Sequence, residues 1–485
     1  MTSRLRPAFL ALMLLAAPSF ASAQLVAVSP AAQKYGEMCA GCHGVEMRGG
    51  QGPALADPTW LHGSSDEEVA RSIRQGFRPS MPAFGGALSE PDIKALVDYL
   101  RETRAAKPMR NNTGLREAYE PTGVPRGVVR TERASFRVEK VAQVDTPYAF
   151  AFLSGNRILI TEVAGRMRVV ENGRLRPEPV AGAPTGVLAG LPRTNKRPLL
   201  DVITHPDYRI NGWIYVATAR ADKPDATGEM TNLITISRGR LRGNQWVDGE
   251  TVMEFNSQST NALRMAFDSS RHLYIGTPES RRDHPMPLAL SPAQDLASPW
   301  GKILRMSDDG RVPPDNPFLG RKDAYPYIWA YGLREPLTLA FDRTGELWSS
   351  ENGPRGGDEF NHIRPGRNYG WPVVTWGHPY DARLQASNPE QPGVEPPVIS
   401  FAPSPALSVL TFYEGDAFPG WKGAALLGSM KQMELYRVVL DGDRAVVQET
   451  VLRGVDRLRD IDVGPDGYVY LLTDSGFLIR LVPDA

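Results

Sequence analysis

The chain has 485 residues, and its 55 basic residues balance its 55 acidic ones. A net charge of zero gives no support to nucleic acid or another polyanion as a partner. The content of 41% hydrophobic and 23% charged residues is that of a folded globular protein, and the length predicts more than one domain.

Residues 1–23 predict a secretory signal peptide. Two arginines precede an apolar run over residues 8–17, and the sequence ASA at 21–23 provides a small-residue cleavage site. An uncleaved anchor is the alternative, but the apolar run is short for a bilayer span. Since we find no second hydrophobic span, we expect an exported protein with no stable membrane insertion.

The segment MCAGCHG, residues 38–44, contains both cysteines of the chain. Two thiols at this spacing, followed directly by a histidine, indicate covalent attachment of a c-type haem. Cys39 and Cys42 would bond the haem vinyl groups, and His43 would be one axial ligand of the iron. Export and haem attachment together point to the bacterial periplasm.

Met81, in the loop sequence RPSMPAF, is the expected sixth ligand of the haem iron. Met38 and Met47 are the alternatives, but Met47 lies too close to His43 in sequence to cross the ring easily. Ligation by His and Met raises the reduction potential, which suits electron transfer rather than oxygen activation.

A helix is predicted to begin at Ser89, its N-cap, with Pro91 and Asp92 in the first turn. Helical spacing then predicts a buried face, formed by Ile93, Leu96, Val97 and Leu100. The region from about residue 31 to 103 resembles a small class I cytochrome c, and we assign residues 24–107 to this all-α domain. A cytochrome that only shuttles electrons would leave the rest of the chain unexplained.

After a polar linker, residues 108–132, a repeat appears. A turn and a short apolar strand ending in Ser or Thr recur six times, and the last residues are Thr161, Thr218, Thr277, Ser350, Ser429 and Thr473. Each has an apolar strand upstream, so the unit is a hairpin. Six such hairpins predict an all-β six-bladed β-propeller over residues 133–485, with a β-sandwich as the alternative.

The loops before the first strands and after the second strands of such hairpins meet at one mouth of the central channel. These loops would bring together Arg282, Lys431, Arg457 and Arg459. Guanidinium groups bind carboxylates in a bidentate manner, so this mouth suits a ligand with several carboxylates. Four unrelated surface charges are the alternative.

Two stretches, ENGPRGGDEFNHIRPGRNYGWP and RLRDIDVGPDGYVYLLTD, are similar to the soluble aldose dehydrogenases of the glucose and L-sorbosone dehydrogenase family. The resemblance extends from about Val138 to Pro483. It implies a six-bladed propeller that binds pyrroloquinoline quinone (PQQ), a tricarboxylate, together with calcium.

By position, the resemblance implies that Lys431, Arg457 and Arg459 hold the PQQ carboxylates. Arg282 would lie beside the quinone. Phe401 stands where the family has a tryptophan over the quinone ring.

The resemblance also implies two calcium sites. The main-chain carbonyls of Gly353 and Pro354 would bind the calcium that contacts PQQ. Asp358, Glu359 and the carbonyl of Tyr369 resemble the surroundings of a second, structural calcium, since oxygen ligands suit a hard cation. Without the resemblance, the two carboxylates are ordinary loop residues.

The chain departs from the family where the substrate would bind. The family's catalytic histidine, four residues before Arg264, is Thr260 here. Threonine is no base at neutral pH, and loss of a positioned base costs roughly a hundredfold to ten-thousandfold in rate. Asp283, beside Arg282, is our first choice as the replacement; the others are Glu279, His284 and a desolvated Lys196.

The sequence therefore predicts a periplasmic quinohaemoprotein that oxidises a sugar, or a related alcohol or aldehyde, and passes electrons through its haem to a periplasmic or membrane acceptor. Two alternatives remain. One is a calcium-dependent propeller hydrolase such as a lactonase, which would not need a haem. The other is a propeller that binds PQQ or a sugar without turnover, consistent with the missing histidine.

Overall fold

The structure is a computed structural model of the whole chain. It describes residues 29–39, 43, 47, 55, 63–76, 81, 83–106, 121–185, 198–224, 230–257, 263–279, 291–354, 356–377, 391–401 and 404–484. The predicted signal peptide lies outside the described residues. Within the described part of the chain, no helix has both the length and the apolar character needed to cross a membrane.

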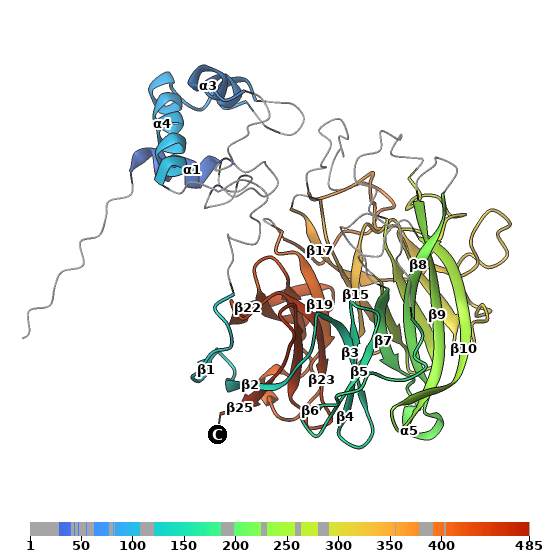
Figure 1. The fold of residues 1–485 in the computed structure, drawn as a ribbon. Helices are drawn as coiled ribbons and strands as arrows, with labels where there is room; N and C mark the ends of the chain where they lie inside the picture. Colours follow the sequence, from blue (N-terminus) through green and yellow to red (C-terminus); the bar gives the residue numbers. More distant parts are fainter. Residues whose placement is uncertain are drawn as a thin grey trace, which may run out of the picture.

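Three helices form a unit separate from the strands (Figure 1): α1 (Pro30–Met38), α3 (Asp66–Gln75) and α4 (Glu90–Ala106). The predicted helix start is confirmed, because Ser89 and Asp92 hydrogen-bond to each other's side chain and main chain ahead of α4. Its predicted buried face is also confirmed, since Ile93, Leu96, Val97 and Leu100 are all at most 4% exposed.

The rest of the described chain forms six antiparallel sheets, the blades of the predicted propeller. Blade 1 is β3 (Pro147–Leu153), β4 (Arg157–Glu162), β5 (Met167–Glu171) and β6 (Arg174–Leu175). Blade 2 is β7 (Leu199–Thr204), β8 (Ile214–Pro224), β9 (Met230–Arg242) and β10 (Gln245–Ser257), with α5 (Tyr208–Asn211) between its first two strands. Blade 3 is β11 (Arg264–Phe267), β12 (His272–Thr277), β13 (Lys302–Ser307) and β14 (Ile328–Tyr331).

Blade 4 is β15 (Pro336–Phe341), β16 (Leu347–Glu351), β17 (Asp358–Ile363) and β18 (Ile399–Phe401). Blade 5 is β19 (Leu407–Phe412), β20 (Ala425–Ser429), β21 (Glu434–Asp441) and β22 (Arg444–Arg453), with a 3-10 turn at Pro419–Trp421. Blade 6 is β23 (Leu458–Val463), β24 (Val469–Thr473) and β25 (Phe477–Pro483), completed by β2 (Ser135–Gln143) and β1 (Val129–Arg130).

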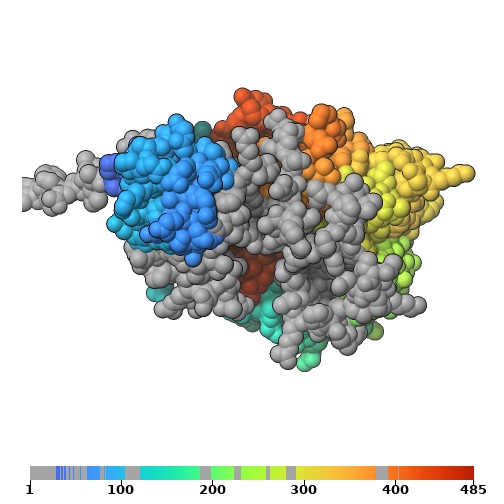
Figure 2. All heavy atoms as spheres, turned by 90° about the horizontal axis from the view of Figure 1, so that it is seen from above, coloured from blue at the N-terminus to red at the C-terminus, as the bar shows by residue number. Residues whose placement is uncertain are grey.

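The propeller is closed by strands from both ends of its chain. The early strand β2 pairs with the last strand, β25, so blade 6 has strands from both ends. The first strands of successive blades contact one another in order, and β23 returns to β3. Seen from above, the blades follow one another around the molecule in chain order (Figure 2). The predicted six-bladed propeller is confirmed, and this radial repetition leaves only short, protected sheet edges.

The Ser or Thr repeated in each second strand, which lies at or near the strand end in every blade except blade 2, has a structural reason. All six residues are buried, with exposed fractions of 7% or less. The Oγ1 of Thr277 accepts a hydrogen bond from the main-chain N–H of Lys302, at the start of the third strand. In blade 5, the hydroxyl of Ser429 does the same for Glu434. The hydroxyl thus satisfies a buried main-chain donor where the two strands meet.

Five of the six first strands carry a β-bulge near their start, at the mouth of the channel. In β23, Leu458 pairs with Thr473 and Asp460 pairs with Leu472, so Arg459 is the extra residue. A bulge bends the strand and re-aims the side chain of the extra residue. The sequence-based domain limits place 108–132 in a linker, but the chain already contacts the propeller from Thr122 onward.

Candidate active site at the channel mouth

The mouth of the channel is the end where each first strand begins and each second strand ends. The loops after β16 and β20 and the loop before β23 all belong to this end. Lys431 and Arg457 come from these loops and Arg459 from the bulge at the start of β23, and the structure brings at least the two arginines together. The mouth therefore has the cationic character expected from the sequence.

Arg457 and Arg459 share one carboxylate. Arg459 donates from Nε to Oδ1 of Asp474 at 2.7 Å, and its Nη2 lies 2.6 Å from the same oxygen. Arg457 Nε lies 3.3 Å from Oδ2 of Asp474. On the other side, Arg459 Nη1 is 3.0 Å from the sulfur of Met430. Asp474 thus holds both guanidinium groups in place, while one carboxylate against two arginines leaves net positive charge for an anionic ligand.

Lys431 lies in the loop that follows β20. The main-chain N–H groups of Met430 and Lys431 donate to the carbonyls of Ala406 and Pro405, just before β19. These two bonds fix the start of the loop against the neighbouring first strand. Together with the bulge at Arg459, they give the three predicted carboxylate-binding residues a rigid main chain.

Beneath the arginines, a buried ionic group joins four blades. We call Asp201, Arg264 and Asp460 the channel knot. Arg264 donates to Asp201 Oδ1 at 2.9 Å, and its guanidinium lies 3.9 Å from Asp460 Oδ2. It also donates to the carbonyls of Tyr148 and Arg459. The knot therefore fixes the main chain at Arg459, which the sequence assigns to PQQ.

The two carboxyl groups of the channel knot have pKa values above the usual value for aspartate. Burial raises the pKa of Asp201, and it raises that of Asp460 to about 7 against the opposing effect of Arg264. Each also accepts a main-chain hydrogen bond, from Met265 and Phe150 respectively. With one guanidinium for two carboxylates, the knot holds a proton readily near neutral pH.

The loop after β16 supplies the predicted calcium ligands Gly353 and Pro354. Gly353 donates its N–H to Oδ1 of Asp358 at 3.0 Å, and a Cβ on Gly353 would meet the Gly356 carbonyl oxygen at 2.1 Å. Only glycine fits there. Among the described residues, neither the Gly353 nor the Pro354 carbonyl accepts a main-chain hydrogen bond. Both oxygens are available to a hard cation, so the loop fits calcium.

Two buried carboxylates, those of Glu351 and Glu359, lie below the loop after β16. Glu351 and Glu359 face each other across Asn361, whose Nδ2 donates to both at 3.1 Å. With Tyr369 they line a small cavity of about 10 Å³, room for one water molecule or ion. Burial raises the pKa of Glu351 to about 7, and burial plus the charge of Glu351 raises that of Glu359 well above its usual value.

Asp358 does not belong to this cavity. Consecutive residues of a strand face opposite sides of the sheet, and Asp358 accepts hydrogen bonds from Ser404 Oγ and from the N–H groups of Gly353 and Leu407. The structure thus places Glu351, rather than Asp358, beside Glu359. Within the described residues, no group of three or more His, Cys, Asp or Glu side chains could hold a metal, so carbonyl oxygens would have to complete either site.

Phe401 is 8% exposed and lies in a hydrophobic cluster of blades 4 and 5. Its ring centroid is 5.9 Å from that of Tyr436. Its carbonyl accepts a hydrogen bond from Gly357 at 2.8 Å. The main chain of Phe401 is therefore hydrogen-bonded to the loop after β16, which carries the predicted calcium ligands.

In the helical unit, Cys39 caps the end of α1, and the N–H of His43 donates to the Cys39 carbonyl at 2.8 Å. His43 is 7% exposed. Met47 is fully buried in the hydrophobic cluster of this unit, whereas Met81 is only partly buried. The fold thus gives Met47 a packing role, and Met81 as the axial ligand stays a prediction.

Several predicted residues lie outside the described residues: Cys42, Lys196, Thr260, Arg282, Asp283 and His284. Glu279 is described, and it is 4% exposed. Its carboxylate accepts hydrogen bonds from Ser291 and from the indole of Trp371. Because these bonds tie Glu279 to the wall of the mouth, it fits a structural role better than that of a free base.

Sequence reasoning missed four carboxylates that organise the mouth: Asp201, Glu351, Asp460 and Asp474. A signal was present for two of them. Asp201 and Asp460 interrupt the apolar first strands LLDVIT and LRDIDV, and a buried carboxylate requires a partner. The identity of the partners could not be read from the sequence.

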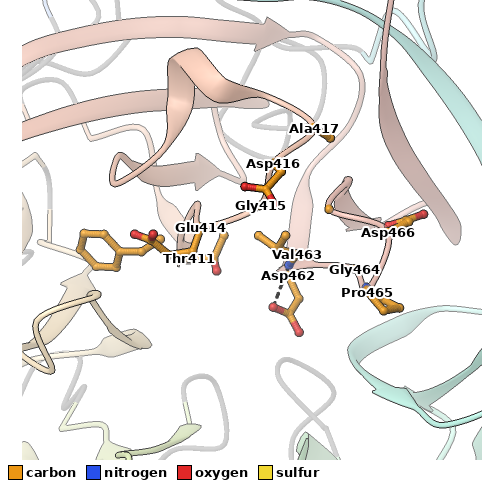
Figure 3. A pocket seen from close by; sticks show the side chains of 12 residues that line it. Thr411, Glu414, Gly415, Asp416, Ala417, Asp462, Val463, Gly464, Pro465 and Asp466 are labelled. Carbon is orange, nitrogen blue, oxygen red and sulfur yellow. Dashed lines mark hydrogen bonds between the residues drawn. The ribbon is translucent and has the colours of Figure 1, made fainter.

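A larger cavity, of about 420 Å³, lies at the other end of the channel (Figure 3). It is lined by the turns that follow β19 and β23. Glu414, Asp416, Asp462 and Asp466 give it an acidic lining, and Figure 3 shows Asp462 directed away from Glu414 and Asp416. Such a lining repels a tricarboxylate, so the cavity is not the site for PQQ.

A closed six-bladed propeller with two arginines on one carboxylate at its mouth, on the same chain as a helical unit with a haem-attachment motif, is an arrangement typical of a redox protein. Residues 144–480 match the family model described as Glucose / Sorbosone dehydrogenase, and residues 26–100 match that of Cytochrome C oxidase, cbb3-type, subunit III. The chain therefore belongs to the glucose/sorbosone dehydrogenase family and carries an N-terminal cytochrome c domain.

Individual relatives agree with this assignment. Aldose sugar dehydrogenase YliI of Escherichia coli (strain K12) is 33% identical over 355 residues, which cover 70% of this chain and 91% of that protein. The PQQ-bound structure of aldose sugar dehydrogenase from Streptomyces coelicolor has a TM-score of 0.55 and 26% identity, covering 72% of this chain and 98% of that one. The cytochrome oxidase subunit CcoP of Rubrivivax gelatinosus is 35% identical over 85 residues, or 16% of this chain and 28% of that protein.

Proposed function

We propose that the protein is a periplasmic PQQ-dependent dehydrogenase that oxidises a sugar, or a related alcohol or aldehyde, and delivers the electrons to its own c-type haem. The observation that carries this proposal is the arrangement of Arg457 and Arg459 on Asp474 at the propeller mouth. It occurs in a chain that also has a haem-attachment motif. A tricarboxylate quinone and a haem on one chain would place a hydride acceptor and a one-electron acceptor in the same molecule.

The residues of the mouth have distinct tasks in this proposal. Arg457, Arg459 and Lys431 bind and orient the carboxylates of PQQ, and the carbonyls of Gly353 and Pro354 hold calcium. When bound, PQQ supplies a hydride acceptor, and the haem supplies a one-electron acceptor. Asp283 takes the proton of the substrate hydroxyl in place of the family histidine.

The predicted substrate side of the mouth differs in sequence from the resembled family. The resemblance retains the predicted cofactor positions Lys431, Arg457 and Arg459. It is lost at Thr260, at Lys196, where the family has glutamine, and at residues 333–338, which read LREPLT where the family has HRNPQG. This difference supports a substrate other than a simple aldose. Thr260 also supports a second candidate, a propeller that binds PQQ without turnover.

The test is rapid mixing of the oxidised, haem-loaded protein, reconstituted with PQQ and calcium, with a panel of aldoses, sorbosone and simple alcohols. The visible spectrum of the haem reports its reduction. Reduction that requires both PQQ and one substrate supports the dehydrogenase and its internal electron path. A haem that stays oxidised with every substrate, in protein shown to bind PQQ, favours the binding propeller.

A further inference from the structure

The propeller begins with a segment that runs along the outside of blades 5 and 6. We call residues 121–134 the anchor segment. It leads into β2, which runs from the far end of the channel back to the mouth because it pairs antiparallel to β25. The anchor segment therefore descends from the mouth, as Figure 1 shows beside β22.

The upper end of the anchor segment is bound at the mouth. Both the N–H and the hydroxyl of Thr122 donate to the carbonyl of Gly454, at 2.6 and 2.9 Å. Gly454 has a φ of +68°, and a Cβ there would lie 2.8 Å from Thr122 Oγ1. Glycine is thus required both by the backbone and by the close approach of Thr122.

The rest of the segment is also bound. Val124 packs against the hydrophobic core of blades 5 and 6. Near the lower end, the N–H of Glu132 donates to Oε1 of Glu449 at 2.6 Å, while Oε2 of Glu449 accepts from buried Arg437. A segment held at both ends and in the middle has a fixed path.

Gly454 opens the loop that carries the predicted cofactor residues. We call residues 454–457 the rim loop. Its Asp456 is buried and accepts hydrogen bonds from the N–H groups of Arg457 and Ser475, so the loop is rigid. Thr122 therefore binds to the same short loop that presents Arg457.

Only residues 107–120 connect α4 to the anchor segment. Fully extended, they span at most about 50 Å, and on average far less. A tether of this length gives a local concentration in the millimolar range for the domain it carries. Because the chain joins the propeller at Thr122, beside the rim loop, the haem domain is connected at the mouth end of the propeller.

We infer that the rim loop, with Thr122 bound to it, is the docking surface for the chain's own haem domain and is the exit for electrons from the mouth. This inference rests on the proposed function. Each step moves one electron from the reduced quinone to the ferric haem, the protons pass to solvent, and an external one-electron acceptor reoxidises the haem between steps. Thr122 acts as a positioning residue.

The test compares the full-length, haem-loaded protein with a release variant, Thr122→Gly with Val124→Ser, and with a control, Arg126→Lys, at an exposed position of the same segment. Each of the three proteins also carries Arg453→Cys, at the mouth end of β22. A fluorescent label is attached to this cysteine, and the haem quenches its emission when the haem domain lies close. We expect strong quenching in the parent and control and clearly weaker quenching in the release variant. This measurement needs neither PQQ nor substrate.

The second readout uses PQQ, calcium and an active substrate. We expect haem reduction in the release variant to slow by about two- to threefold, because the effective concentration falls roughly as the −3/2 power of the tether length, with turnover measured by a small soluble dye unchanged. Equal quenching in all three proteins would overturn the docking surface. Unequal quenching with no haem reduction in any protein would keep the docking surface and reject the proposed function.

Discussion

Arg264, at the start of β11, donates a hydrogen bond from Nη2 to the main-chain carbonyl of Arg459 on β23. This contact joins blade 3 to the bulge that presents a predicted PQQ-binding side chain. It shows how an ionic group beneath the mouth determines the shape of the mouth.

Replacing Arg264 should destabilise the propeller strongly. Arg264→Met leaves Asp201 and Asp460 buried without their cation, and the free energy of unfolding should fall by about 3–5 kcal/mol. Urea denaturation followed by circular dichroism measures this. Arg444→Met is the control, because its ion pair with Asp441 is exposed and contributes about 1 kcal/mol at most. Similar losses in the two variants would contradict a structural role for the knot.

Removing Arg459 should weaken PQQ binding. Arg459→Met takes away a nearly buried guanidinium, which should cost about 2 kcal/mol or more, or roughly thirtyfold in Kd. Titration of the PQQ-free protein, followed by absorbance of the quinone, gives the constant. Arg453→Met, an exposed arginine at the same end of blade 5, should bind PQQ like the parent. An unchanged Kd in Arg459→Met would remove this residue from the site.

Calcium should stabilise the protein more at pH 8 than at pH 5. The folded pKa values of Glu351 and Glu359 lie above the usual 4.5, with Glu351 at about 7. Without metal, the folded state thus holds extra protons between about pH 4.5 and 7, and the free energy of unfolding falls as pH rises through that window. A bound cation favours the charged forms and reverses this loss.

Melting temperatures with and without calcium at the two pH values measure this effect. Glu359→Gln should remove most of the pH dependence, because it eliminates one of the two facing charges. The carbonyl ligands Gly353 and Pro354 do not titrate, but Asp358, which accepts a hydrogen bond from the Gly353 N–H, has its pKa raised to about 6, so the Glu359→Gln variant is needed to separate the two sites. The contrary outcome is that calcium stabilises the parent and Glu359→Gln by the same amount at each pH. That result would exclude the Glu351 and Glu359 pair as a calcium site.

Met81 and Met47 should respond differently to truncation. Met81→Ala removes the predicted axial sulfur, so the haem potential should fall and the reduced haem should bind carbon monoxide. Met47→Ala leaves a cavity in the core of the helical unit and should cost about 2–5 kcal/mol of stability without changing the haem spectrum. A normal spectrum in Met81→Ala would assign the sixth ligand to another residue.

Asp283→Asn should lower turnover by about a hundredfold to ten-thousandfold, because the variant loses the proposed proton acceptor. Steady-state assays with a dye acceptor at saturating PQQ measure this. His284→Gln, assayed in the same way, tests the neighbouring alternative base. Full turnover in Asp283→Asn would remove Asp283 from consideration and direct attention to Lys196.

Patterns local in the chain were sufficient for the haem motif, the helix at Ser89 and the six hairpins. A haem attachment site needs neighbouring residues, and a hairpin is set by its own turn and alternation, so each is complete within about ten residues. The convergence of loops at one mouth followed from the hairpin topology alone. This topology predicts that Arg457 and Arg459 lie at the same mouth of the channel.

The partners of these residues were decided only by the tertiary structure. Arg264 meets Asp201 and Arg459 across separations of 63 and 195 residues, and Glu359 faces Glu351 because strand alternation turns Asp358 to the other side. Such contacts depend on register and on which blades are neighbours, and no local pattern encodes either. The sequence by itself determined the two domains and the propeller fold, and the closed ring determined which charges meet beneath the mouth.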